Sequence, residues 1–414
     1  MKGRIALAAV LFAVFAFING CDSSYNNPIE TQKSINVSGR VIGYLFNQGL
    51  PYAKIRIEDK IITADQFGKF YIPEVKTPYT VYITDSASSR GCIYEGLSEP
   101  ECHLKFVNGT SPNELRATVN VSYSGNIGTS NARKIFFTDG KNVSGIGNDP
   151  FCEVFLPDNT PVTGKVCYLL YTTGISFDKF GYIDNVTLAP NVNVNLSFND
   201  SICSFHPYSV SVSGSINTFS NNIQNNYAFS TIFVSPRQTN FYSTNIQFEN
   251  FSGNTFNILL PANLSVNYYP LMYIIFQNTS NNHYTQAFYS LPKAGGTGIV
   301  LNAPSTPIIL SPAENSVLDS NTNISFSGTG TQEFFYLTIS DSLKSIKYIT
   351  SANSVNLSSI SKLGLGRFNP NSRIYFEVLA ISQFNSLNDF VNPNINNLAI
   401  RNSFPVSRQY YFNP

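Results

Sequence analysis

Side chains that could act as a base or a nucleophile are few and far apart in this chain. The histidines number three, His103, His206 and His283. No G-x-S-x-G motif supplies a serine nucleophile that one of them could activate. A Ser-His-Asp arrangement is therefore not predicted.

The acidic residues gather in short local runs instead of facing pairs. Glu58 lies in the sequence EDK, and Glu95, Glu99 and Glu101 lie within YEGLSEPEC. Glycoside hydrolysis needs two carboxylates held across a rigid cleft, whereas runs of this kind are typical of solvated loops. The sequence predicts a protein that is not an enzyme.

Metal and cofactor sites are not predicted either. The cysteines form no CxxC pair, and zinc sites usually combine such pairs with nearby histidines. The stretch TDGKN, from Thr138 to Asn142, offers oxygen ligands for calcium, but an Asp-Gly pair favours a hairpin turn. The glycine-rich stretches GIGNDP and KAGGTG do not open a helix after a parallel strand, as a phosphate site requires. We expect no metal and no cofactor.

The charge composition narrows the possible partners. Lys and Arg total 26 and Asp and Glu total 25, which gives a formal net charge of +1. This balance predicts neither a basic surface for nucleic acid nor a polybasic membrane patch. Hydrophobic residues make up 43% of the chain, which is enough to argue against disorder.

The N-terminus has the pattern of an export signal. A basic MKGR segment precedes an uncharged apolar run from Ile5 to Ile18, which is short for a membrane span. The following INGC resembles the lipobox of bacterial lipoproteins, which implies cleavage after Gly20 and lipidation of Cys21. The alternative is an ordinary secretory signal that is cut nearby. We expect an exported protein of the bacterial cell envelope that is anchored in the membrane through Cys21. It would face the periplasm or the cell surface. The sequence does not decide whether the anchor lies in the inner or the outer membrane.

The remaining cysteines fit an exported protein. Cys92 and Cys102 are close in the sequence, as are Cys152 and Cys167, so two local disulfides are predicted. Cys203 is left without a partner in this scheme.

The elements that would carry these residues are short β-strands. Runs of alternating apolar and polar residues are separated by Gly, Asn and Pro, which is the pattern of antiparallel strands. In ITADQFGKFYIPEV, Asp65 and Gly68 are predicted to form a hairpin turn. Asp65 would accept hydrogen bonds from backbone amides ahead of it, and Gly68 would take a positive φ. Phe70 and Ile72 then share a face and enter the core, so the turn is predicted to determine shape and not chemistry.

The order VSGRV, GLPYAKIRI, TADQFGKFYI and YTVYI resembles the carboxypeptidase regulatory-like family. The match covers about residues 36–85, and its most specific part is Asp65, Gly68 and Phe70 after Thr63. The resemblance implies a seven-stranded sandwich of transthyretin-like topology in which these residues are structural. Members of the family are accessory modules beside peptidases, outer-membrane transporters and adhesins, and some are thought to bind sugar.

Two further features extend this architecture. Ser-Gly before an apolar residue recurs with Gly39, Gly125 and Gly214, at intervals of about 90 residues that suit sandwich-sized repeats. The last segment, from about Pro304 to Pro414, resembles a fibronectin type III domain. That resemblance rests on PIILSPAENSV, FYLTIS and NPNSRIYFEVLAI, although the Trp of that family's core is missing.

We therefore predict an all-β chain of tandem Ig-like and transthyretin-like β-sandwich domains. The predicted divisions are a lipoprotein signal peptide at 1–20, a tether at 21–34, a carboxypeptidase regulatory-like sandwich at 35–110, sandwiches at 111–204 and 205–302, and a fibronectin type III-like sandwich at 303–414. Such a chain is expected to act without catalysis, as a lipid-tethered rod that holds or contacts envelope or surface proteins. The alternatives are a string of carbohydrate-binding modules and an accessory subunit of an exported enzyme or transporter. Many tyrosines could stack on a glycan, but the chain has no Trp, whose larger face stacks best.

Overall fold

The computed structural model describes most of the chain beyond residue 32. The described residues are 33–43, 48–85, 87, 89–106, 115–126, 132–140, 143–148, 150–171, 177–205, 208–218, 223–233, 249–251, 253–262, 264, 268–280, 282–303, 306–328, 333–366, 368, 372–382, 386–392, 401–402 and 406–412. Cys21, the predicted signal peptide, His206 and the end of the predicted turn at Asn142 lie outside them. No helix among the described residues is long and apolar enough to cross a membrane.

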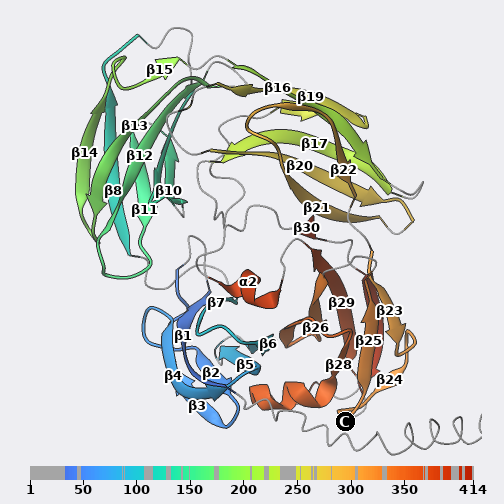
Figure 1. Cartoon of the computed structure of the whole chain (residues 1–414). Coiled ribbons are helices and arrows are strands. Elements are labelled where there is room, and N and C mark those ends of the chain that lie inside the picture. Colours follow the sequence, from blue (N-terminus) through green and yellow to red (C-terminus); the bar gives the residue numbers. More distant parts are fainter. Residues whose placement is uncertain are drawn as a thin grey trace, which may run out of the picture.

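β-Strands dominate the described residues, so the predicted all-β fold class of tandem sandwiches is confirmed. The strands fall into four groups in chain order, which we call the first to fourth units (Figure 1). Alternation explains their cores, because successive side chains of a strand point to opposite faces of its sheet.

The first unit consists of two sheets. One has the order β4-β1-β7, in which β1 pairs antiparallel with β4 and parallel with β7. The other has the order β6-β5-β2-β3 and is antiparallel throughout. The strands are β1 (Ser34–Ile42), β2 (Lys54–Ile57), β3 (Lys60–Thr63), β4 (Lys69–Lys76), β5 (Tyr79–Asp85), β6 (Arg90–Leu97) and β7 (Glu101–Lys105).

The second unit repeats this connectivity. Its first strand, β8, pairs antiparallel with β11 and parallel with β14, and its other layer has the order β10-β9-β12-β13. A pairing of β10 with β11 joins the two layers. The strands are β8 (Arg116–Tyr123), β9 (Ala132–Thr138), β10 (Val143–Asn148), β11 (Phe151–Phe155), β12 (Val162–Tyr171), β13 (Phe177–Leu188), β14 (Asn193–Phe198) and β15 (Ser204–Phe205).

The third unit has the same connectivity once more. Here β16 pairs antiparallel with β19 and parallel with β22, and the other layer has the order β18-β17-β20-β21. The strands are β16 (Tyr208–Asn217), β17 (Ile223–Phe233), β18 (Glu249–Phe251), β19 (Thr255–Pro261), β20 (Tyr269–Asn278), β21 (His283–Ser290) and β22 (Gly296–Asn302). Three consecutive units therefore share one topology, with the first strand at the centre of a three-stranded sheet.

A glycine occupies the same place in the first and third units. Gly39 lies opposite Phe70 and Gly214 lies opposite Phe256 across the antiparallel pair. A Cβ at Gly39 would lie 3.1 Å from the ring of Phe70, and one at Gly214 would lie 2.8 Å from the ring of Phe256. The same Cβ atoms would lie only 2.0 Å from the carbonyl oxygens of Cys102 and Ile299 on the parallel neighbour strand. The missing Cβ therefore lets that strand approach closely and lets a buried aromatic ring cover the central strand of the sheet.

The second unit has other residues at the equivalent position of its three-stranded layer. By register, Val119 takes the place of the glycine, and it lies opposite Cys152, a smaller side chain that leaves room for it. Gly125, the third glycine of the Ser-Gly pattern, lies beyond the end of β8. The pattern therefore marks equivalent positions in the first and third units but not in the second.

The fourth unit is an Ig-like sandwich. One sheet has the order β23-β25-β28, and the other pairs β27, β26, β29 and β31 in that order, with β24 parallel to β31. Its elements are β23 (Ile308–Ser311), β24 (Val317–Leu318), β25 (Asn323–Ser327), β26 (Glu333–Ser340), β27 (Ser345–Thr350), β28 (Ser354–Asn356), the 3₁₀-helix η2 (Leu357–Leu363), β29 (Arg373–Ser382), α2 (Leu387–Val391), β30 (Arg401–Asn402) and β31 (Val406–Phe412).

The first and fourth units are joined edge to edge. β27 pairs in parallel with β6 over six residues, from Ser345 opposite Arg90 to Thr350 opposite Glu95. The four-stranded sheet of the first unit thus continues into the fourth unit. An edge strand exposes unpaired backbone N–H and C=O groups, and this pairing satisfies those of β6.

The other contacts complete a closed circuit of four units (Figure 1). The second and third units share one apolar cluster that includes Cys167 and Leu169 on one side and Met272 on the other. A single pairing of Ala287 with Arg401 links β21 to β30. The expected rod is therefore wrong, because apolar faces and a sheet edge bring the ends of the described chain together.

Candidate interaction surfaces

The predicted turn residues lie at a corner between the two sheets of the first unit. Oδ1 of Asp65 accepts hydrogen bonds from the N–H groups of Phe67 and Lys69, both at 2.8 Å. Gly68 has a φ of 73°, and a Cβ there would lie 2.6 Å from the carbonyl oxygen of Val41. The expectation of a hairpin is wrong, because β3 pairs with β2 whereas β4 pairs with β1. The turn carries the chain from one layer to the other.

The predicted disulfides are not found. Cys92, Cys102, Cys152, Cys167 and Cys203 are all free and buried. Cys152 faces the interior of the second unit, whereas Cys167 faces the third unit. The two thiols point to opposite faces because the position of each residue along its strand, and not its distance in sequence, decides its direction.

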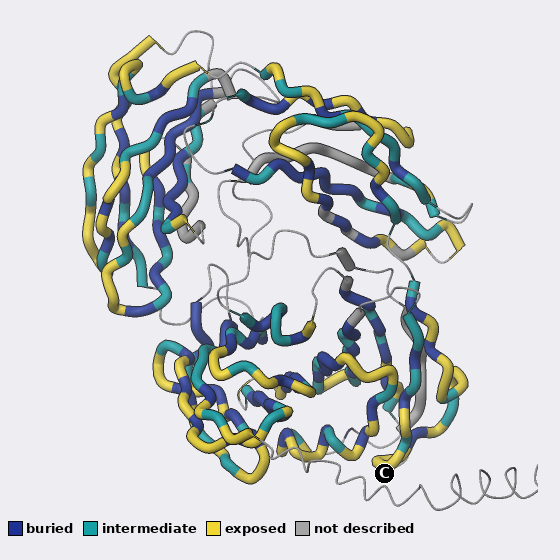
Figure 2. Tube along the Cα trace, in the orientation of Figure 1, coloured by how far each residue is buried: buried dark blue, intermediate teal, exposed yellow. Residues whose placement is uncertain are grey.

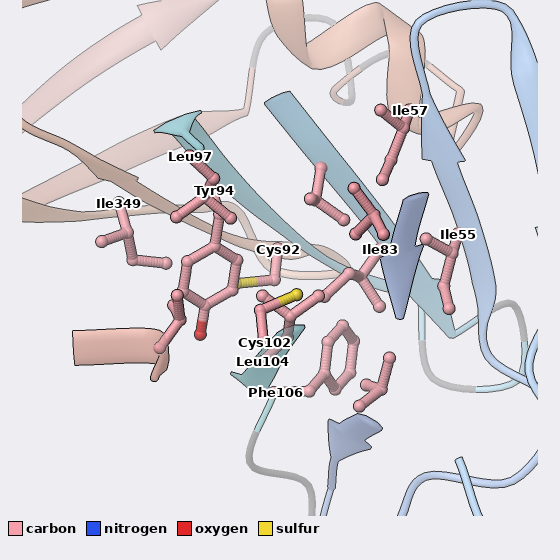
Figure 3. Close-up of a cluster of buried hydrophobic side chains, with 14 of the residues drawn as sticks. Ile55, Ile57, Ile83, Cys92, Tyr94, Leu97, Cys102, Leu104, Phe106 and Ile349 are labelled. Atoms are coloured by element: carbon pink, nitrogen blue, oxygen red, sulfur yellow. The ribbon is translucent and has the colours of Figure 1, made fainter. Parts of the chain in front are cut away.

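Cys92 and Cys102 act as small apolar side chains in the core of the first unit. Figure 3 shows both directed into the same buried cluster, which also contains Tyr94 and Ile349. Each thiol donates a hydrogen bond to a backbone carbonyl oxygen. The acceptor is Lys105 for Cys92, at 3.9 Å, and Ser38 for Cys102, at 3.8 Å. Burial raises the pKa of both thiols to about 12, so they stay protonated and unreactive near neutral pH.

The predicted loop acids and histidines do not converge. Glu95 accepts a hydrogen bond from the hydroxyl of Thr350 at 2.8 Å, and His103 lies in β7. Among the residues that the structure describes, no group of three His, Cys, Asp or Glu side chains could hold a metal ion.

The outward face of the sheet β14-β8-β11 carries side chains that do not serve packing. Asn120 lies between Phe151 and Asn195, and Phe151 is 51% exposed. Nδ2 of Asn120 donates to Oδ1 of Asn195 at 3.0 Å. One step along the strands, the hydroxyls of Ser122 and Ser197 lie 3.0 Å apart.

An ion pair with a fixed geometry borders these residues. Nη1 of Arg116 lies 3.0 Å from both carboxylate oxygens of Glu153, and the guanidinium lies 5.1 Å from the centre of the Phe155 ring. We call the outward-facing set the polar face, and it consists of Arg116, Thr118, Asn120, Ser122, Phe151, Glu153, Phe155, Asn193, Asn195 and Ser197.

The polar face results directly from strand alternation. In β8, Ala117, Val119 and Val121 point into the core, so the residues between them point outward. β14 reads NVNLSF, and its polar residues are exposed. The signal for this face was present in the alternating segments ATVNVSY and NVNLSF, but only the parallel pairing of β8 with β14 places their polar residues side by side.

Comparisons with known proteins give only distant likenesses. No protein-family profile matches the sequence, and no curated protein does. Among solved structures, the Bacillus anthracis TIE protein is 12% identical, with 65% of this chain and 50% of that chain covered and a TM-score of 0.16. The chain thus spans about half the length of that protein.

Two further solved structures are also distant. A Bacteroides ovatus ATCC 8483 protein named as a proposed adhesin is 11% identical, with 47% of this chain and 97% of that chain covered and a TM-score of 0.16. The four N-terminal Ig domains of Dscam1 are 8% identical, with 92% and 100% covered and a TM-score of 0.16. TM-scores this low carry no argument about function.

Proposed function

We propose that this chain is a non-catalytic interaction protein of the bacterial cell envelope, exported and anchored in a membrane through a lipidated Cys21. The observation that carries this proposal is the polar face, which stays exposed while an apolar face of the same unit packs against the third unit. The partner is then a surface or envelope component that binds through hydrogen bonds to Asn and Ser side chains and through contact with Phe151.

The contrast in burial between layers supports this assignment. In β12, five consecutive residues from Val166 to Leu170 are buried, so both faces of that strand are covered. In the three-stranded sheets, exposed residues alternate with buried or half-buried ones (Figure 2). In the second unit, the third unit therefore covers the four-stranded layer, and the three-stranded layer faces outward with polar residues.

A glycan is the second candidate partner, because the polar face combines an exposed aromatic ring with amide and hydroxyl groups. An exposed ring beside amide and hydroxyl groups can stack on a sugar and bond its hydroxyls. Many other aromatic side chains are unable to do so, because they are buried, as Tyr94, Tyr168 and Tyr289 are. An envelope protein remains the first candidate, since an outward sheet face of this kind suits a polar protein surface equally well.

The finer domain assignments are also proposals. We propose that the first unit is a carboxypeptidase regulatory-like domain and the fourth a fibronectin type III-like domain, with the boundaries predicted above. The two-layered connectivity of β1 to β7 supports the first assignment. The pairing of β24 with β31 beside two sheets supports the second.

The test is binding of the mature protein to a glycan panel and, in parallel, to its own cell-envelope extract. Phe151→Ala and Asn120→Ala should each weaken saturable binding at least about tenfold, since each removes a contact at the centre of the face. The matched control is Tyr71→Ala, which removes an exposed ring from β4, the corresponding strand of the first unit. Binding that survives both variants would overturn the role of the polar face, and equal loss in the control would point to a general surface effect.

A further inference from the structure

The outward face of the first unit's four-stranded sheet is only partly covered by the fourth unit. Ile93 and Tyr82 on this face belong to the buried apolar cluster of the fourth unit. Across the sheet, Arg56 on β2 lies opposite Tyr82 on β5. Ile61 on β3 lies opposite Arg56 on its other side and is 63% exposed. Between this open part of the sheet and the end of η2 lies a pocket of about 400 Å³.

The pocket has a basic rim. Lys54 and Arg56 line it from β2, and Lys362 lines it from η2, while no Asp or Glu among the described residues takes part in its lining. Nε of Arg56 donates to the carbonyl oxygen of Glu58 at 3.0 Å, which holds the guanidinium in place. Nζ of Lys362 lies 5.6 Å from the centre of the Tyr82 ring. No carboxylate among the described residues forms an ion pair with these three side chains.

The floor and the roof are apolar and closely packed. Tyr82 and Leu363 are both buried, and Leu365 is partly buried beside them. Leu363 and Leu365 reach this position because residue 91 is a glycine. A Cβ at Gly91 would lie 2.7 Å from Cδ1 of Leu363 and 3.0 Å from Cδ1 of Leu365.

We propose that this pocket binds a small organic anion, whose carboxylate or phosphate is held by Lys54, Arg56 and Lys362 and whose short apolar part lies against Tyr82 and Leu363. The volume is within the range of pockets that enclose small ligands. Three cations around one opening attract an anion and repel a cation.

This site has a structural consequence of its own. Lys54 and Arg56 belong to the first unit, and Lys362 belongs to the fourth. A ligand held by both units binds only the closed circuit, so it stabilises that state by mass action. The proposal does not depend on the polar face, which lies on the second unit.

The experiment uses the mature protein and four probes, hexanoate, hexyl phosphate, inorganic phosphate and hexanol, with binding followed by calorimetry and by thermal unfolding. We expect saturable binding of hexanoate or hexyl phosphate with a raised Tm, and the two arms distinguish a carboxylate from a phosphate. Equal binding of hexanol would overturn the role of charge. Equal binding of inorganic phosphate would overturn the apolar subsite, and binding of no probe would overturn the site.

Substitutions locate the binding on the pocket. Arg56→Gln and Lys362→Gln should each weaken binding at least about tenfold, because each removes a charged hydrogen-bond donor. The matched control is Lys293→Gln, which removes an ammonium that lies over Tyr268 and Tyr269 of the third unit, away from this pocket. Loss of binding in the control equal to that in the pocket variants would overturn the assignment to this pocket.

Discussion

The first unit contacts its two neighbours by different physical means. Against the fourth unit it pairs a whole strand, β6 with β27, and buries Ile349 next to Tyr94 (Figure 3). Against the second unit it uses charge, since Arg40 and Lys69 both reach Oδ2 of Asp158, at 2.9 and 2.6 Å. The unit that follows it in the chain is therefore held by an ion pair that low pH can break, and the unit most distant in sequence is held mainly by backbone pairing and apolar packing.

The environment of Asp158 explains this sensitivity. Burial by itself would raise the pKa of this carboxyl, but hydrogen bonds from Lys69 and Thr160 and the charge of Lys69 hold it well below its usual range. The contact to the fourth unit consists mainly of backbone pairing and apolar packing, with a hydrogen bond from the hydroxyl of Thr350 to Glu95 and a neutral latch. In that latch, the side chain of Asn388 in α2 accepts from N–H of Ser98 at 2.9 Å and donates to its hydroxyl at 2.8 Å.

The largest expected effect comes from breaking the contact with the fourth unit. Ile349→Ala leaves a cavity in the joint core and should lower the free energy of unfolding by about 2–5 kcal/mol, measured by urea denaturation. Leu259→Ala is the control, because Leu259 is 46% exposed on a three-stranded sheet, and it should change stability by less than about 0.5 kcal/mol. An equal loss of unfolding free energy in the two variants would show that Ile349 does not stabilise the contact between the first and fourth units.

A smaller effect is expected at the charged contact. Asp158→Ala leaves the guanidinium of Arg40, 13% exposed, without its carboxylate, and should cost about 1–3 kcal/mol. Urea denaturation measures this loss as well. The control is Asp184→Asn, which removes an exposed ion pair with Lys165 and should cost less. If the control costs more, the contact at Asp158 is not the stronger of the two.

The pH dependence separates the two contacts further. Because the pKa of Asp158 is below its ordinary value of 3.8 in the folded protein, its contribution is fully present above that value. The contribution is lost as the pH falls from there toward the folded pKa. Unfolding free energies measured from pH 6 down to pH 3 should therefore fall less steeply in Asp158→Asn than in the native chain. Parallel curves would contradict the assignment.

Thiol labelling gives the smallest but most local readout. Cys92 and Cys152 are both free thiols that could be alkylated, but both are buried. We therefore expect both to resist alkylation at pH 8 in the native chain. In Ile349→Ala, Cys92 should be labelled before Cys152, because Cys92 lies on β6 at the loosened contact, opposite Lys347. Mass spectrometry of the labelled peptides gives the order, and simultaneous labelling would show that the units open together.

The sequence was sufficient for the strands and for local geometry. Alternation predicted that Phe70 and Ile72 enter the core, and both are buried. Side-chain bonding at Asp65 and the positive φ of Gly68 also follow from residue type alone.

The sequence was insufficient wherever distant segments meet. The local sequences of β6 and β27 do not predict the parallel pairing between residues 90–95 and 345–350. The disulfide prediction failed for the same reason, since it used distance along the chain and not the face of the strand. The polar face and the basic pocket both combine strands or units that only the tertiary fold brings together.

In the first and third units the first and last strands pair in parallel, which has a mechanical consequence. In the first unit this pairing runs from Ser38 opposite Glu101 to Ile42 opposite Lys105. A chain that is pulled at both ends drags β1 toward its start and β7 toward its end, so the two strands slide along each other. The hydrogen bonds between them are then loaded together and not one after another. A protein built in this way resists stretching at both of these units.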